Sequence, residues 1–178
     1  MSTEHAPALG RAELDALYRD TVADVHAYAL SLLGDRPSAE DITATAFERL
    51  YRSRSRLDRA RGTPRALLFT IARNAALDEL RRRRRRGLRP LSEDEPLAQD
   101  HTADQIELLE RRETVRVALA TLDPREREIV LLKFHGQLPN AELARVLGIS
   151  ESNVGTRLHR ALTRLRERCA EQSQREVA

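Results

Sequence analysis

The sequence predicts an all-α protein made of two small helical domains joined by a flexible acidic linker, with a helix-turn-helix in the C-terminal domain. Three observations support this prediction. Leu, Ala, Arg and Glu dominate the 178 residues, whereas Gly and Pro number only 7 each, a composition typical of helical proteins. Apolar residues recur at helical spacing in several separate segments. Residues 90–104 are acidic, contain Pro96 and lack that spacing, so they fit a linker between domains at 11–89 and 105–170.

Composition also limits the core and the contact surfaces. Aromatic residues make up 3% of the chain and Trp is absent, so we expect aliphatic cores. The net charge is only +3, but acidic residues prevail up to residue 49 and arginines prevail from 52 to 89, ending in six consecutive arginines at 81–86. Such asymmetry predicts separate acidic and basic contact surfaces.

The cysteine count and the lack of long apolar runs indicate in which cellular compartment the protein is expected. Cys169 is the single cysteine, so an intrachain disulfide is excluded and a reducing compartment fits. No segment has the features of a signal peptide or the length of a membrane span. The expectation is a cytoplasmic protein without membrane insertion.

Three helices are predicted in the N-terminal domain. The first covers residues 11–33 and ends at Gly34, and the second begins near residues 37–38. Residues 53–62 are polar and aperiodic, which predicts a loop. Thr63 followed by Pro64 has the chemistry of an N-cap and a first helical position, so a third helix begins there and runs into the arginines.

The third helix carries polar residues on its predicted outer face. Leu67, Leu68, Ile71 and Ala75 are expected to face inward. The outward stripe and its edges comprise Thr70, Arg73, Asn74, Leu77, Asp78 and Arg81. An exposed Asn is mildly unfavourable within a helix, so Asn74 indicates either a function or a tolerated surface residue. The arginines at 81–86 indicate either phosphate contacts or a solvated helix end at the negative pole of the helix.

Helical spacing resumes after the predicted linker. Asp123 and Pro124 predict a helix start, and the apolar side of that helix is expected to comprise Ile129, Val130, Leu132 and Phe134. Residues 139–168 then predict a helix-turn-helix, with Asn140 capping its first helix, Gly148 at the turn and Ser150 capping the second helix.

The second helix of this pair has a buried stripe and a polar face. The stripe comprises Val154, Leu158, Ala161 and Leu165. The polar face and its flank comprise Ser152, Asn153, Thr156, Arg157, His159, Arg160, Thr163 and Arg164. Small hydrogen-bonding residues followed by arginines suit a helix in the DNA major groove, although an ordinary αα-hairpin is the alternative.

Three segments in this order carry a family resemblance: PSAEDITATAFERLYR, PRALLFTIARNAALDELRRRRR and LDPREREIVLLKFHGQLPNAELARVLGISESNVGTRLHRALTRLRE. Across residues 14–168 the chain resembles bacterial RNA polymerase sigma factors of the extracytoplasmic-function (ECF) type, which retain only regions 2 and 4. The resemblance implies a factor that binds core RNA polymerase and promoter DNA and directs promoter-specific initiation. An anti-sigma factor is a further expected partner, and no cofactor or metal is expected.

The resemblance also implies roles for individual residues. The expected contacts to core polymerase are Glu40, Asp41, Phe47 and Tyr51. Recognition and opening of the −10 element would fall to Arg56, Asp58, Thr70, Arg73, Asn74, Asp78 and Arg81, since RNAALDELR matches the family pattern RNxxxDxxR. Recognition of the −35 element would use Ser152, Asn153 and Thr156 near base edges and Arg157, His159 and Arg160 on phosphates. The acidic linker would run through the polymerase active-centre cleft and RNA exit path.

Three positions depart from the family pattern. Leu67 stands where Trp is usual, Ala44 replaces a usual Gln, and Gly155 replaces a frequent Lys in the recognition helix. Gly155 removes one contact and weakens the helix by about 1 kcal/mol relative to Ala. The promoter sequence therefore cannot be copied from relatives.

Two other protein classes would share some of these features. A dimeric repressor or activator would explain the helix-turn-helix but not the separate arginine-rich helix. An enzyme acting on nucleic acid would need a nucleophile, a metal-ligand spacing or a phosphate-binding loop, and the sequence contains none of the familiar motifs. The protein is therefore expected not to be an enzyme.

Overall fold

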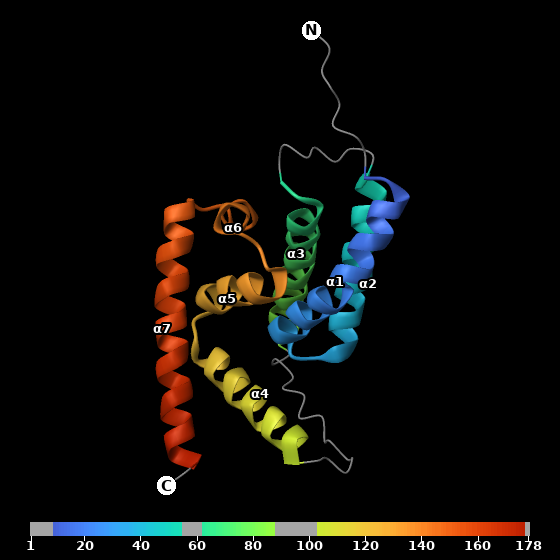
Figure 1. Cartoon of the computed structure of the whole chain (residues 1–178). Coiled ribbons are helices and arrows are strands. Elements are labelled where there is room, and N and C mark those ends of the chain that lie inside the picture. Colours follow the sequence, from blue (N-terminus) through green and yellow to red (C-terminus); the bar gives the residue numbers. More distant parts are fainter. Residues whose placement is uncertain (1–8, 55–61, 88–102, 177–178) are drawn as a thin grey trace.

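The computed structural model describes residues 9–54, 62–87 and 103–176, and this part of the chain is all-helical, as predicted. It contains seven helices: α1 Arg11–Leu33, α2 Arg36–Ser53, α3 Pro64–Arg85, α4 Ala103–Thr121, α5 Pro124–Gly136, α6 Asn140–Leu147 and α7 Glu151–Glu176 (Figure 1). The predicted helix-turn-helix is confirmed as α6 and α7. Most of the predicted linker lies outside the described residues, and its last two positions, 103 and 104, begin α4.

Local chemistry explains where α1 ends and where α2 and α3 begin. Gly34 ends α1 in the left-handed conformation, at φ 74°, which costs Gly little. The Asp35 side chain accepts a hydrogen bond from the Ser38 backbone N–H at the start of α2. The Thr63 hydroxyl accepts one from the Ala66 N–H at the start of α3. These side-chain caps satisfy N–H groups that have no partner inside the helix.

One predicted cap is wrong. Asp123 caps α5 as expected, but Asn140 is the first residue of α6 and Pro139 occupies the cap position, where no side-chain hydrogen bond forms. The Pro139 carbonyl instead accepts hydrogen bonds from the Glu142 and Leu143 N–H groups. The Asn140 side chain accepts one from Lys133 Nζ at 3.3 Å, so it ties α6 to the end of α5.

The core of the N-terminal helices has an aromatic centre that the expectation of aliphatic cores missed. Tyr28 on α1 and Phe69 on α3 are fully buried, and their rings meet edge to face with centroids 5.7 Å apart. Leu33, Leu50 and Leu68 surround the same core and are also fully buried. Leu67, in the place of the usual Trp, packs partly buried against it.

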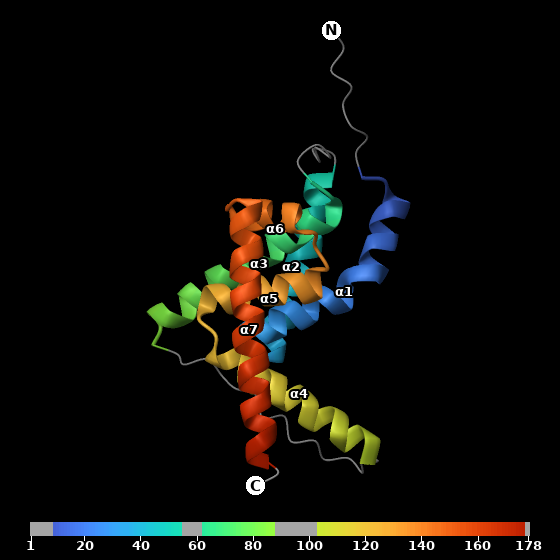
Figure 2. The same cartoon turned by 60° about the vertical axis from the view of Figure 1, so that its left-hand side comes forward.

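The two sets of helices are packed together. In both views α5 lies between α7 and the N-terminal helices, and it contacts α1, α3 and α7 (Figures 1 and 2). The buried apolar residues accordingly form one continuous cluster that includes members from α1 to α3 and from α5 to α7.

This position of α5 corrects its predicted apolar side. The helix is covered on two sides, so four consecutive residues, 129–132, are all buried, including Leu131. Phe134 was expected to be buried but is 61% exposed, because it falls outside both contacts.

Candidate nucleic-acid and polymerase interfaces

The predicted outer stripe of α3 is present on the surface. Asn74, Asp78 and Arg81 are exposed at spacings of four and three residues, so they lie on one side of the helix. Arg81 donates to Asp78 at 2.7 Å within this stripe. Thr70 is half-buried, and its hydroxyl donates to the Ala66 carbonyl one turn earlier. The stripe therefore offers an amide and a charge pair to a ligand, while Ala66, Leu68 and Ala72 bury the opposite side of α3.

Arg73 lies apart from that stripe. Its guanidinium pairs with Glu128 on α5, with Nε–Oε1 at 2.8 Å and Nη2–Oε2 at 3.2 Å. Both side chains are largely buried, at 20% and 10% exposure. Tyr28 lies close by, and burial first, then the Glu128 carboxylate, raises the pKa of its hydroxyl. An expected −10 contact is thus engaged with another helix in this arrangement.

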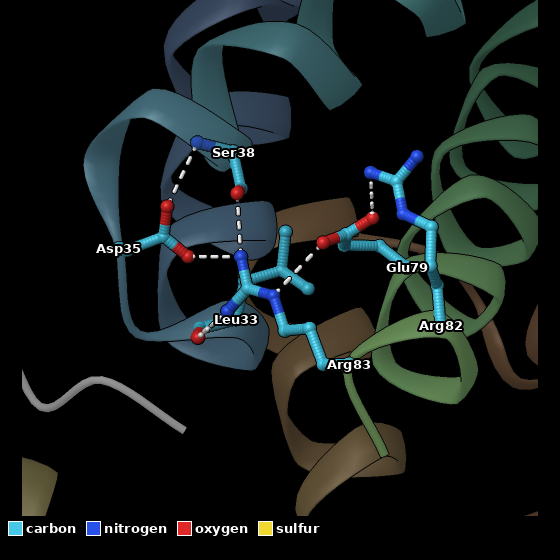
Figure 3. A network of polar contacts seen from close by, with 6 residues as sticks. All are labelled: Leu33, Asp35, Ser38, Glu79, Arg82 and Arg83. Atoms are coloured by element: carbon cyan, nitrogen blue, oxygen red, sulfur yellow. Dashed lines mark hydrogen bonds and ion pairs between the residues drawn. The ribbon is translucent and has the colours of Figure 1, made fainter. Parts of the chain in front are cut away.

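The arginine run at the end of α3 divides into one structural residue and five exposed ones. Arg83 bonds to the Leu33 carbonyl at 3.0 Å, to Glu79 at 2.9 Å, and also to Asp35 and Ser38 at the start of α2 (Figure 3). Although burial opposes it, bonding to Ser38 and Arg83 holds the pKa of Asp35 below its ordinary value. The sequence suggested either phosphate contacts or a solvated helix end for these arginines. Arg83 does neither, because its side chain is bonded within the protein. Arg81, Arg82 and residues 84–86 remain exposed and basic.

The second helix of the helix-turn-helix, α7, has the predicted polar face on its exposed side. Val154, Leu158 and Ala161 are buried. Ser152, Thr156, His159 and Arg160 are exposed, and Asn153 and Arg157 are half-buried at the flank. The Ser150 hydroxyl accepts a hydrogen bond from the Asn153 N–H at 3.2 Å, as its expected capping role requires. This face can contact an external partner without disturbing the helix packing.

The expected polymerase contacts lie on α2. Glu40 and Asp41 are exposed, and Glu40 pairs with Arg36 at 3.1 Å. Phe47 meets Tyr18 of α1 edge to face, with centroids 4.8 Å apart, and Tyr18 is 49% exposed. Tyr51 is half exposed, and Arg54, 3.8 Å from its ring centre, lowers the pKa of its hydroxyl. Exposed aromatic side chains such as Tyr18 and Tyr51 are enriched at protein-binding surfaces.

The sequence places Tyr18 among the apolar positions of the first helix and does not predict its exposure beside Phe47. Arg56 and Asp58 lie outside the described residues. Among the residues that the structure describes, no three His, Cys, Asp or Glu side chains gather as a metal site would require. No helix within the described ranges is both long and apolar enough to cross a membrane.

Comparison with known proteins gives two family models. Sigma-70 region 2 matches residues 17–86, and Sigma-70 region 4 matches residues 112–165. A relative described as ECF RNA polymerase sigma factor SigL, from Mycobacterium tuberculosis (strain ATCC 25618 / H37Rv), is 32% identical over 161 residues, covering 90% of this chain and 91% of its own. ECF RNA polymerase sigma factor SigM from Bacillus subtilis (strain 168) is 28% identical, covering 86% and 93%.

Solved structures share the fold. The sigma factor RpoE from Bartonella quintana, in complex with the anti-sigma factor NepR, aligns with a TM-score of 0.69 at 21% identity, covering 88% of this chain and 96% of its own. CnrH, in complex with the cytosolic domain of CnrY, aligns with a TM-score of 0.64 at 23% identity, covering 89% and 88%.

Proposed function

Because this chain belongs to the ECF RNA polymerase sigma factors, which direct transcription initiation, we propose that α3 and α7 are its two promoter-reading helices. Region 2 would comprise residues 11–89 and region 4 residues 105–170, with 90–104 as the connection. The main observation behind this proposal is that the chain has two separate helices of the same kind. Each buries one side and presents polar, hydrogen-bonding side chains on the other. A dimeric DNA-binding regulator would need only one such helix per chain.

On α3 the proposed −10 contacts are Thr70, Arg73, Asn74, Asp78 and Arg81, joined by Arg56 and Asp58 from the preceding segment. Extruding a base from a duplex costs a few kcal/mol. An exposed amide and carboxylate can hydrogen-bond the edges of a displaced base, and Arg81, which follows them on the same stripe, can bind its phosphate. Binding the opened strand would therefore offset part of the cost of opening.

On α7 the proposed −35 contacts are Ser152, Asn153 and Thr156 at base edges, with Arg157, His159 and Arg160 at phosphates. On α2 the proposed polymerase contacts are Glu40, Asp41, Phe47 and Tyr51. The protein would act in the cytoplasm beside the polymerase and would perform no catalysis of its own. By analogy with RpoE and NepR, an anti-sigma factor is proposed as a further partner.

Runoff transcription with core polymerase on a genomic DNA library tests this function and identifies the promoter together. Asn74→Ala is expected to slow open-complex formation more than initial DNA binding, and Thr156→Ala to weaken binding at the −35 element. Arg85→Ala on α3 and Arg166→Ala on α7 are matched controls, since both are exposed and outside the proposed reading faces. Absence of any specific transcript, or equal loss in all four variants, would refute the proposal.

A further inference from the structure

Gly155 lies inside the proposed −35 helix and borders its reading face. It is at the start of the second turn of α7, which is continuous from Glu151 to Glu176. Ser152 and His159 are three and four residues away on the same side of the helix, and both are exposed. Gly155 itself is half-exposed, so it does not belong to the buried stripe.

The fold of the chain does not require glycine at this position. Gly148, at the end of α6, has a φ of 67°, which other residues rarely adopt. Gly136 ends α5 at a point where a Cβ would lie only 3.1 Å from Leu138 Cγ. Gly155, by contrast, has no positive φ, and a Cβ there would meet no atom of the described residues within 4 Å. Nothing in the described part of the chain therefore excludes a side chain from this point.

Glycine at this position also makes α7 less stable, because Gly is less favourable than Ala inside a helix. What glycine allows in return is close approach, since another molecule can reach the helix backbone where a side chain is missing. α7 lies along one edge of the molecule (Figure 1), and the space beside Gly155 is open. In a helix that reads DNA, the molecule that enters this space is a group in the major groove.

The two flanks of the reading face differ in charge. Arg157 and Arg160 are three residues apart, so they share one flank. Gly155 lies about 200° around the helix from Arg157, since successive residues are about 100° apart. The exposed carboxylate of Glu151 stands one turn before Gly155 on the same side. Phosphates are therefore expected along the arginine flank, and an uncharged group beside Gly155.

The surface that Gly155 offers is apolar. Backbone N–H and C=O groups inside an α-helix bond to each other, so a glycine without a side chain exposes mainly C–H groups. In the major groove the base edges carry donors and acceptors, and thymine also carries a 5-methyl group that proteins recognise by apolar contact. A methyl group needs neither an opposite charge nor a hydrogen-bond partner. It is therefore the group of the major groove that matches the space beside Gly155.

We propose that Gly155 is a specificity-determining residue for the −35 element: its missing side chain makes room for the 5-methyl group of one thymine, which packs against the backbone of α7. Cytosine lacks that methyl group and would leave the space empty. This role goes beyond the loss of one contact that the sequence indicated for Gly155. The inference rests on the proposed function, because it assumes that α7 reads the −35 element.

Deoxyuridine substitution tests the contact, because deoxyuridine differs from thymidine only by the missing 5-methyl group. The full chain with core polymerase is bound to a labelled promoter fragment, selected by runoff transcription, in which each thymine of the −35 element is replaced in turn. One replacement is expected to weaken wild-type binding by about threefold. Gly155→Ala is expected to bind the unmodified fragment about tenfold more weakly than the wild type, because its Cβ would occupy the space of the methyl group. On the fragment with that one deoxyuridine, the two proteins should bind within about twofold of each other.

Gly148→Ala is the matched control, since it adds the same methyl group in the turn before α7. Deoxyuridine should not change its binding relative to the wild type. A thermal melt separates binding from folding: Gly155→Ala should melt no lower than the wild type, so its weaker binding cannot come from unfolding. Wild-type affinity of Gly155→Ala on the unmodified fragment, or a loss that no deoxyuridine restores, would overturn this inference alone. Failure of the wild type to distinguish the −35 element from unrelated sequence would overturn the proposed function instead.

Discussion

Arg83 and Asp35 form a largely buried ion pair that joins the end of α3 to the start of α2. Arg83 also bonds to the Leu33 carbonyl, so one side chain fastens the α1–α2 turn. Removing one partner of a buried ion pair leaves the other charge buried without a partner, which typically lowers the free energy of unfolding by about 3–5 kcal/mol. Arg83→Ala is expected to reduce the free energy of unfolding of region 2 by about 3 kcal/mol, measured by urea denaturation.

Arg85→Ala serves as its control, since Arg85 belongs to the same run but is exposed. Its unfolding free energy is expected to stay within about 0.5 kcal/mol of the wild type. Equal losses in the two variants would contradict the distinct role of Arg83.

The same pair predicts sensitivity to acid. The pKa of Asp35 is lower in the folded chain than its ordinary value, so the folded state binds a proton there less readily than the unfolded state. The stabilisation is fully present above about pH 4 and is lost as pH falls through the lowered pKa. Urea titrations at several pH values should show a smaller acid-dependent loss in Asp35→Asn than in the wild type. An identical pH dependence in the two proteins would exclude Asp35 as the cause.

Replacing either of two glycines, Gly148 or Gly155, by Ala is expected to change the free energy of unfolding in opposite directions. A Cβ at Gly155, inside α7, would meet no atom within 4 Å. Gly155→Ala is therefore expected to raise the unfolding free energy by about 1 kcal/mol. Gly148 has a φ of 67° at the end of α6, where Ala is strained, so Gly148→Ala is expected to lower it by about 1 kcal/mol. Thermal melts of the two variants should shift in opposite directions, and a shared direction would contradict the assignment.

The environment of His135 predicts that the packing of α5 against α1 weakens in mild acid. Burial lowers the pKa of its imidazole, although the nearby Asp24 carboxylate opposes this, and its Nε2 lies 3.4 Å from Ser31 Oγ on α1. A chain in which α5 separates from α1 would bind a proton there more readily, so this packing loses stability as pH falls below about 6.5. Scattering between pH 8 and about pH 5.5 should show expansion of the wild type. Expansion of equal size in His135→Gln would assign the effect to another group.

The sequence predicted what is local and missed what is distant. Thr63, Asp123 and Ser150 cap helices through residues two or three positions away, so spacing alone identifies them. The Arg73–Glu128 contact joins residues 55 positions apart, and no periodicity encodes such a pairing. The exposure of Phe134 was missed for the same reason, since it depends on which helices cover α5.

The candidate reading faces were more predictable than the contacts between regions. The buried stripe of α7 repeats at helical spacing, so its polar face follows by exclusion. Arg83 could not be separated from its five arginine neighbours, because its partners come from the end of α1 and the start of α2.

The most direct test of the central claim is fluorescence anisotropy of a labelled promoter fragment, selected by runoff transcription, with the purified chain alone and with core RNA polymerase. A chain whose helices α3 and α7 both pack against α5 and α6 should bind the fragment weakly alone, and binding should become tight and specific for both elements when core polymerase is added. Equally tight and specific binding by the chain alone, or no gain from the polymerase, would contradict the account.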